Sequence, residues 1–258
     1  MEKPDPAAAF DRDPNDGIVA TSQAPQSFRY YEYIMAAFVT ILLLSNLIGA
    51  SKPSYVTLPG GEQWIFGAGV LFFPISYIIG DVLTEVYGYA RARRVIWTGF
   101  AALAFMAFMA WVVVSLPPAD GWPYQSDYEN VFGNSWRIVV ASIVAFWAGE
   151  FANSIVMAKM KVWTEGRALW MRTIGSTVVG QGLDSAIFYP LAFWALPGWP
   201  IETLVQVMIS QWIIKVVWEA VLTPVTYVVV NKLKQAEGVD LFDMGTDFSP
   251  FSGKEKRA

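Results

Sequence analysis

The 258-residue sequence contains no cysteine and no histidine. Without cysteine, the chain cannot hold a disulfide framework, a thiol nucleophile or a thiolate metal site. Without histidine, it lacks the commonest metal ligand and the usual proton shuttle at neutral pH. Charged residues are scarce too, at 16% against about 25% in an average soluble domain. The net charge of −4 gives no basic surface for nucleic acid. We therefore expect no metal, no cofactor, no nucleic-acid partner and no catalytic residues.

Apolar residues dominate the composition: 55% of the chain is hydrophobic and 16% is aromatic. A helix needs about 20 mostly apolar residues to cross a bilayer. Six segments approach or exceed that length: Tyr30–Ala50, Trp64–Gly88, Val95–Leu116, Trp136–Met160, Thr173–Leu196 and Ile201–Val230. They predict an all-α membrane protein, a bundle of six transmembrane helices within residues 29–231. Pro74 removes a helical hydrogen bond and is expected to kink the second span.

Both ends of the chain are polar. Residues 1–28 predict a disordered N-terminal tail, and residues 232–258 predict a loose C-terminal tail. The first apolar segment is too long for a signal peptide, so we expect it to stay as an anchor. Basic residues gather in alternate loops, which the positive-inside rule places in the cytoplasm. These residues are Arg29, Arg91, Arg93, Arg94, Lys159, Lys161, Arg167, Arg172, Lys232 and Lys234. We expect a multi-pass protein of the inner (plasma) membrane with both termini cytoplasmic.

Two connecting segments allow more than one interpretation. Segment 161–172 is either an amphipathic helix lying at the membrane interface, with Trp163 and Trp170 at headgroup level, or a short basic loop. Segment 117–135 is long, acidic and aromatic, and it is either a plain loop or a lid over an outward-facing cavity.

Ionisable and amide side chains recur inside the expected spans. A charge at the centre of a span costs roughly 2.5–3.5 kcal/mol, so such residues usually face the bundle interior. Here they recur every three or four residues, which places them on one face of each helix. The four stripes are Tyr77, Asp81 and Glu85; Glu150, Asn153 and Met157; Gln181, Asp184, Ser185 and Phe188; and Gln211, Lys215 and Glu219. The simplest packing turns all four stripes toward one polar cavity.

Three of these residues lie deep in the bilayer. Asp184, Glu150 and Lys215 are about 11 to 14 residues into their spans, or roughly 16–21 Å at 1.5 Å per residue. They fall in the middle third of a core about 30 Å thick. An isolated ammonium would be costly there, so Lys215 should pair with Glu219, Glu150 or Asp184.

A purely structural role is the alternative for the interior residues. They could form ion pairs and interhelical hydrogen bonds, and Asp81 and Glu85 could anchor the arginine-rich loop that follows them. Small residues should let the fourth and fifth spans pack closely. These are Gly149, Ala152, Gly175, Ser176, Gly180 and Gly182. The third span has no charge and no amide, so we expect it at the periphery, facing lipid.

Several motifs are specific enough to compare with a family. The most specific is the run Gly80-Asp81-Val82-Leu83-Thr84-Glu85-Val86-Tyr87-Gly88, followed by Arg91 and Trp97. The others are Ser45-Asn46 with Lys52, Glu150-Phe151-Ala152-Asn153-Ser154 and Gly180-Gln181-Gly182-Leu183-Asp184-Ser185. Together they resemble the signature of the queuosine precursor transporter family, also called the vitamin uptake transporters. The resemblance covers residues 30–230.

The resemblance implies a six-span bundle similar to the substrate-binding subunits of energy-coupling-factor transporters. It also implies import of 7-cyano-7-deazaguanine or 7-aminomethyl-7-deazaguanine, salvaged for the tRNA base queuosine. The implied partners are this purine-like small molecule and the lipid bilayer. The choice between the two precursors, the energy source and the presence of a homo-oligomer stay open.

The stripes and the resemblance together suggest a substrate site. A deazaguanine presents an N1–H and an exocyclic amine side by side, and one carboxylate can accept both. An amide can meet the ring carbonyl, and an aromatic side chain can stack on the ring. We expect Asp184 or Glu150 to read the N1–H edge, supported by Gln181 and Asn153. The candidate residues are Asn46, Tyr77, Asp81, Glu85, Glu150, Asn153, Gln181, Asp184, Gln211 and Lys215.

Two other functions compete with an importer that works alone. A substrate-binding subunit of an ATP-driven vitamin or nucleobase importer would need a partner ATPase and a small-residue docking stripe, for which AALAFMAFMA in the third span is a candidate. A membrane enzyme would have to work with carboxylates alone, because the sequence offers no nucleophile–base pair and no metal site. An importer, and not an enzyme, is the function we expect.

Overall fold

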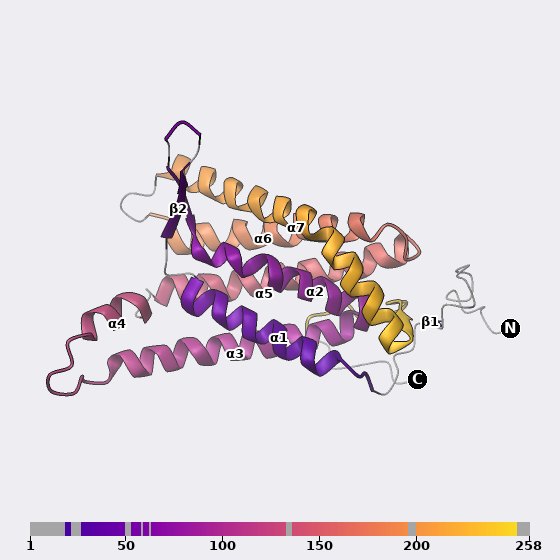
Figure 1. The fold of residues 1–258 in the computed structure, drawn as a ribbon, viewed down its shortest axis with the longest axis horizontal. Helices are drawn as coiled ribbons and strands as arrows, with labels where there is room; N and C mark the ends of the chain where they lie inside the picture. Colours follow the sequence, from indigo (N-terminus) through magenta and orange to yellow (C-terminus); the bar gives the residue numbers. More distant parts are fainter. Residues whose placement is uncertain are drawn as a thin grey trace.

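The computed structural model describes residues 19–21, 27–49, 53–57, 59–61, 63–132, 136–195 and 200–251. Its elements, in chain order, are β1 (Val19–Thr21), α1 (Tyr31–Leu44), the π-helix η2 (Ser45–Gly49), β2 (Pro53–Thr57), β3 (Gln63–Gly67), the 3-10 helix η3 (Ala68–Leu71), α2 (Phe73–Tyr87), α3 (Tyr89–Ser115), α4 (Gln125–Phe132), α5 (Trp136–Trp163), α6 (Leu169–Phe193), α7 (Ile201–Glu237) and β4 (Val239–Leu241). The long helices lie alongside one another, with β2 and α4 at one end and both chain termini at the other (Figure 1).

Four helices within the described ranges are long and apolar enough to cross a membrane. They are Tyr31–Ile48, Tyr89–Ser115, Val140–Trp163 and Leu204–Glu237. These match the first, third, fourth and sixth expected spans, so the prediction of a helical multi-pass membrane protein is confirmed. The helix α2 has only 15 residues, and α6 carries Arg172, Gln181 and Asp184 along its 25 residues. Neither α2 nor α6 is among the four, because α2 is short and α6 is more polar.

The expected second span, Trp64–Gly88, is wrong in its first part. Residues 63–67 form strand β3, which pairs antiparallel with β2 in a hairpin, and the α-helix begins only at Phe73. Pro74 therefore lies in the first turn of α2, where a backbone N–H has no helical partner to lose. It starts the helix, and the kink predicted at this residue is wrong.

The corner between α2 and α3 is made by Gly88. Its φ of +80° and ψ of 161° lie in a region that other residues adopt only with strain. A β carbon at this position would also come within 3.5 Å of Asp243 Oδ1. That distance is an ordinary van der Waals contact, so glycine is required here by the sharp corner alone.

The helices α5 and α6 pack closely at their glycines, as the small residues predict. A β carbon on Gly149 would lie 3.0 Å from the carbonyl oxygen of Gly180. A β carbon on Gly180 would lie 2.7 Å from Cβ of Asn153. The two backbones thus approach to a distance that no larger residue permits, which brings the polar faces of α5 and α6 to the same side of the bundle.

Segment 161–172 contains no separate interfacial helix. The helix α5 runs to Trp163, a turn spans 164–168, and α6 starts at Leu169. Two of its basic residues, Lys161 and Arg172, are each only 1% exposed, so they point into the protein. The short-loop interpretation is therefore the correct one. In segment 117–135, the described residues include the short helix α4.

Residues 232–251 form defined elements and contacts, contrary to the loose tail expected for residues 232–258, of which 252–258 lie outside the described residues. The helix α7 has 37 residues, about 55 Å at 1.5 Å per residue, and continues past the expected boundary at 231. Gly238 ends it with a φ of +67°, and strand β4 follows and pairs in parallel with β1. Residues 242–251 then pack against α3 and α5. Most of the N-terminal stretch 1–28 lies outside the described residues.

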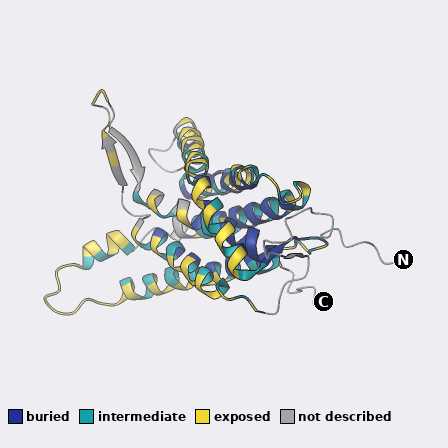
Figure 2. Ribbon diagram, turned by 45° about the vertical axis from the view of Figure 1, so that its right-hand side comes forward, coloured by how far each residue is buried: buried dark blue, intermediate teal, exposed yellow. Residues whose placement is uncertain are grey.

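The buried core concentrates toward the end of the bundle where the termini lie (Figure 2). The described residues 80–89 of α2 and its corner are all buried, enclosed by α1, α3, α5 and α7. The second half of α3 is different, because Phe105, Phe108 and Trp111 are each more than half exposed. The exposed apolar surface of α3 fits the expected peripheral position of the third span.

Candidate functional site

Buried polar side chains form three successive groups along the interior of the bundle, one helical turn apart on α2. The upper layer contains Tyr77, Glu150, Gln181, Asp184 and Lys215. The middle layer contains Asp81, Asn153, Thr177 and Glu219. The ion cluster, at the end near the termini, contains Glu85, Lys161, Arg172, Lys234 and Asp240.

The upper layer joins α2, α5, α6 and α7. Lys215 Nζ lies 2.6 Å from Asp184 Oδ2, and both side chains are partly buried, at 15% and 17% exposure. The ammonium of Lys215 also lies 5.9 Å from the ring centre of Tyr77, which hydrogen-bonds Gln181. The prediction that Lys215 pairs with a carboxylate is confirmed, with Asp184 as the partner.

Glu150 is the unsatisfied member of the upper layer. Its side chain is 2% exposed, and neither carboxylate oxygen has a hydrogen-bond partner within the part of the chain that the structure describes. Its Oε2 lies close to α2, 3.1 Å from the position of a β carbon on Gly80. Gln181 Oε1 and Ser185 Oγ are likewise buried and without a partner there. Buried acceptors without donors are expensive, so this layer suits a ligand that brings donors.

The middle layer lies one turn further along the same helices. Asn153 Nδ2 donates a hydrogen bond of 2.7 Å to Asp81 Oδ1. Asp81 Oδ2, Asn153 Oδ1, Thr177 Oγ1 and both oxygens of Glu219 have no hydrogen-bond partner among the described residues. Each of these side chains is at most 1% exposed. The layer thus combines two buried carboxyl groups with one amide and one hydroxyl.

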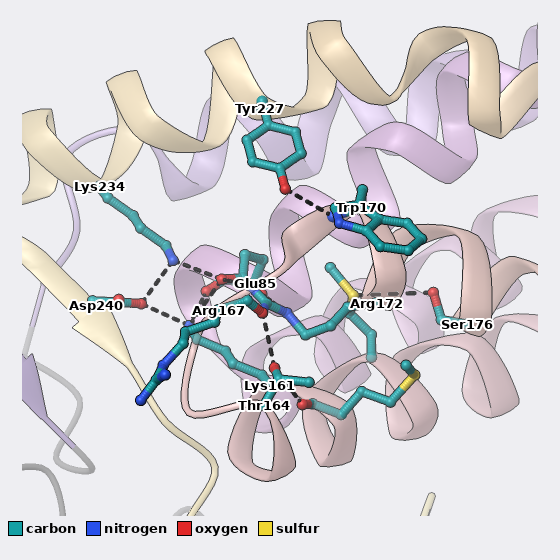
Figure 3. A network of polar contacts seen from close by, with 12 residues as sticks. Glu85, Lys161, Thr164, Arg167, Trp170, Arg172, Ser176, Tyr227, Lys234 and Asp240 are labelled. Carbon is teal, nitrogen blue, oxygen red and sulfur yellow. Dashed lines mark hydrogen bonds and ion pairs between the residues drawn. The ribbon is translucent and has the colours of Figure 1, made fainter. Parts of the chain in front are cut away.

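In the ion cluster, in contrast, both carboxylates form ion pairs with cations (Figure 3). Glu85, at 0% exposure, lies 2.8 Å from Arg172 Nη2 and 2.6 Å from Lys234 Nζ. Lys161 Nζ and Lys234 Nζ each lie 2.8 Å from Asp240 Oδ1. Arg172 continues the network with hydrogen bonds to Thr164 Oγ1 and to a backbone carbonyl in the turn after α5. The cluster therefore ties α2, α5, α6, α7 and β4 together.

Asp240 and Asp243 connect the C-terminal segment to this end of the bundle. Burial alone would raise the pKa of Asp240, but Lys161 and Lys234 outweigh it and hold that pKa well below its ordinary value. Burial raises the pKa of Asp243, although its carboxylate accepts hydrogen bonds of 3.1 and 3.0 Å from the backbone N–H of Tyr89. This N–H opens α3, so Asp243 satisfies one of the unpaired donors at that helix end.

The last described residues continue across α3. Arg93 Nη1 donates hydrogen bonds of 2.9 and 2.8 Å to the carbonyls of Asp247 and Ser249, and Trp97 Nε1 donates one of 2.8 Å to the carbonyl of Pro250. The ring of Phe251 packs on Trp97. The segment thus covers the near end of α3 with specific contacts.

The structure divides the ten predicted site residues. The upper layer brings together Tyr77, Glu150, Gln181, Asp184 and Lys215, and the middle layer holds Asp81 and Asn153. The other three lie elsewhere. Glu85 belongs to the ion cluster and contacts cations of α5, α6 and α7, not the arginines after α2. Asn46 donates to the backbone of its own helix, and Gln211 is half-buried on α7. A cavity of about 200 Å³ opens between α6 and α7, lined by Gly182, Ser185, Met208, Ile209 and Trp212.

Sequence reasoning missed the burial of Lys161, Arg172 and Lys234. The positive-inside pattern assigns these residues only as cytoplasmic loop charges. One signal in the sequence could have found them: Glu85 lies in an expected span that has no cation of its own. The charge of Glu85 therefore has to be balanced by cations at the ends of other helices. The roles of Asp240 and Asp243 gave no signal, because a polar tail with no periodicity predicts no contacts.

Comparison with known proteins gives consistent results. Residues 67–229 match the family model described as putative vitamin uptake transporter. A probable queuosine precursor transporter of Bacillus subtilis is 30% identical over 160 residues, which cover 62% of this chain and 69% of the relative. The queuosine precursor transporter of Escherichia coli is 26% identical over 129 residues, which cover 50% of this chain and 56% of the relative. No solved structure matches.

Proposed function

We propose that this chain imports queuosine precursors. The premise is that it belongs to the putative vitamin uptake transporter family and is a membrane transporter rather than an enzyme. The cargo is 7-cyano-7-deazaguanine or 7-aminomethyl-7-deazaguanine, bound in the upper layer. Relatives that carry the name of queuosine precursor transporter support this choice. The imported base would be salvaged for the tRNA modification.

The proposed transporter has six spans, with α2 and α6 added to the four strongly apolar helices. A helix enclosed by other helices need not be apolar, because its polar groups meet protein and not lipid. The helix α2 is enclosed in this way along residues 80–87. The polar residues Gln181 and Ser185 of α6 are each 1% exposed. We infer that the protein lies in the inner membrane with both termini in the cytoplasm, because basic loops favour the cytoplasmic side.

The observation that carries the proposal is the buried carboxylate of Glu150, which has no hydrogen-bond partner among the described residues. A deazaguanine supplies two parallel donors, the N1–H and the exocyclic amine, which match the two oxygens of one carboxylate. Asp184 is already engaged by Lys215 at 2.6 Å. Between the two carboxylates expected to read the base, the geometry therefore favours Glu150.

The neighbours of Glu150 suit the rest of a purine-like ring. Gln181 presents a free carbonyl oxygen within the interior, and Tyr77 is a buried aromatic ring beside the ammonium of Lys215. A cargo placed here would have an aromatic surface for stacking and a cation near its ring carbonyl. Each polar group of the cargo could then find a partner, which a buried site requires.

The experiment compares binding of the deazaguanine with binding of its analogue that lacks the exocyclic amine. Hydrogen bonds to a charged group are worth about 1.5–3 kcal/mol, so Glu150→Gln should weaken binding of the parent base by roughly 10- to 150-fold. The preference for the parent over the analogue should shrink with it. Glu165→Gln is the matched control, because that carboxylate lies in an exposed turn. Unchanged affinity and unchanged preference in Glu150→Gln would refute the assignment.

A further inference from the structure

The proposed base site uses the upper layer, and the middle layer below it contains two further buried carboxyl groups. Asp81 on α2 is 0% exposed and Glu219 on α7 is 1% exposed. No salt bridge reaches either of them within the described ranges, and three of their four oxygens have no hydrogen-bond partner there. The remaining oxygen, Asp81 Oδ1, accepts from the neutral amide of Asn153.

The charged groups around Asp81 are carboxylates. Glu219, Glu150 and Glu85 all act on it electrostatically. Glu85 is compensated by the cations of the ion cluster, and the cation that acts on Glu150 is Lys215, which is bonded to Asp184. The helix α6 contributes only the neutral Thr177 to this layer, and α5 contributes the neutral Asn153. Asp81 and Glu219 therefore act on each other electrostatically, and no ion pair with a cation of the described residues compensates either of them.

Two ionised carboxylates cannot share such a place cheaply. Moving one unpaired charge out of water already costs several kcal/mol, and a second like charge adds repulsion. One bound proton removes a charge and turns one carboxyl into a donor for the other. We propose that Asp81 and Glu219 bind the proton whose movement drives import. The proposal rests on the proposed transport function and adds its energy source.

The position of the pair explains how proton and cargo would be coupled. Asp81 is one turn from Tyr77 on α2, and Glu219 is one turn from Lys215 on α7, so both helices contribute to the upper and the middle layer. A proton taken up from outside lowers the charge of the pair from −2 to −1, which reduces the repulsion and lets α2 and α7 approach. Its release to the cytoplasm restores the repulsion. The rearrangement of these two helices also changes the upper layer, where the base binds.

A metal ion fits the middle layer less well than a proton. The described residues contain no group of three or more carboxylate, histidine or cysteine side chains that could hold a metal ion. A sodium ion would use the same oxygens, so the test must distinguish sodium from protons directly.

The first experiment needs no cargo. Infrared difference spectroscopy of the purified protein at neutral pH should show the carbonyl stretch of a protonated carboxylic acid, shifted in heavy water. Part of this band should disappear in Asp81→Asn and in Glu219→Gln, and it should persist in Glu165→Gln, whose carboxylate is exposed and paired with Arg167. An identical band in all four proteins would mean that the pair carries no proton, and the proposal would be wrong whether or not the cargo is a deazaguanine.

The second experiment measures accumulation in liposomes that contain only this protein, with the membrane potential clamped at zero. One proton per base predicts about tenfold accumulation for each unit of inward pH gradient, because one pH unit is 1.36 kcal/mol. Asp81→Asn and Glu219→Gln should still bind the base but accumulate it only to equality. Accumulation driven by sodium, accumulation independent of any gradient, or loss of base binding in both variants would each overturn the proposal. Wild-type protein that does not bind the base would refute the proposed function instead.

Discussion

Replacing Glu85 by Gln should destabilise the protein far more than the same change in an exposed ion pair. Glu85 is fully buried and lies within 2.8 Å of cationic nitrogens from both Arg172 and Lys234. When every group is ionised, the ion cluster holds three cations and two carboxylates. Its net charge of +1 would become +2 in Glu85→Gln. Removing one partner from a buried ion pair costs about 3–5 kcal/mol.

The expected loss of unfolding free energy can be measured as a decrease in the melting temperature Tm. For a chain of this size each kcal/mol shifts Tm by about 2–4 °C, so Glu85→Gln should lower Tm by roughly 6–20 °C. Glu165→Gln is the control, because Glu165 also lies 2.8 Å from its partner Arg167, but the two side chains are 55% and 81% exposed. An exposed pair contributes only about 0–1 kcal/mol.

The assay is thermal unfolding of both variants and the original protein in the same detergent. Equal Tm shifts in Glu85→Gln and Glu165→Gln would refute the reasoning, because burial is the main difference between the two pairs. A large Tm shift in Glu85→Gln alone would support the conclusion that the ion cluster stabilises the packing of the helices at this end of the bundle.

Three further predictions use the same purified protein. Gly180→Ala should lower Tm by several degrees, because its β carbon would lie 2.7 Å from a side-chain carbon of α5. Gly182→Ala is the control and should change Tm little, because the nearest contact of its β carbon would be at 3.4 Å. Similar Tm shifts in the two variants would contradict the close packing of α5 and α6. The folded pKa of Asp240 is depressed, so its contribution is fully present above the unfolded pKa of about 3.9 and is lost as pH falls below it. The Tm difference between the original protein and Asp240→Asn should therefore hold near neutral pH and narrow below about pH 4, and a gap that widens in acid would be inconsistent with this sign. Lys215→Met should leave Asp184 partly buried without its cation and weaken binding of the base at least tenfold. Lys215→Arg keeps the charge and should retain most of the affinity. Equal affinities of the two variants for the base would exclude a role for the charge.

Periodicity made the interior of the bundle predictable from sequence. Polar residues spaced by three or four must share a helix face, and burial of that face follows from the cost of charge in lipid. This argument found Tyr77, Asp81, Glu150 and Asn153, and it anticipated the pairing of Lys215. The glycines of α5 and α6 were predictable for the same reason, since only close packing explains small residues on adjoining faces.

The parts that escaped prediction have no periodic signal. Strand β3 was read as membrane helix because a short apolar run looks the same in both structures. Pro74 could start a helix or kink one, and only the hairpin before it decides between these. Lys161 and Arg172 look like loop charges until the position of Glu85 in space is known. The docking of Asp240 depends on its contact with Lys161, about 80 positions earlier in the chain, which local sequence cannot reveal.

Uptake of a labelled 7-deazaguanine precursor by liposomes that contain only this protein tests the central claim most directly. The account predicts uptake without any ATPase partner, strong reduction in Glu150→Gln and normal uptake in Glu165→Gln. Uptake that appears only when a partner ATPase and ATP are added, or equal uptake by the two variants, would contradict it.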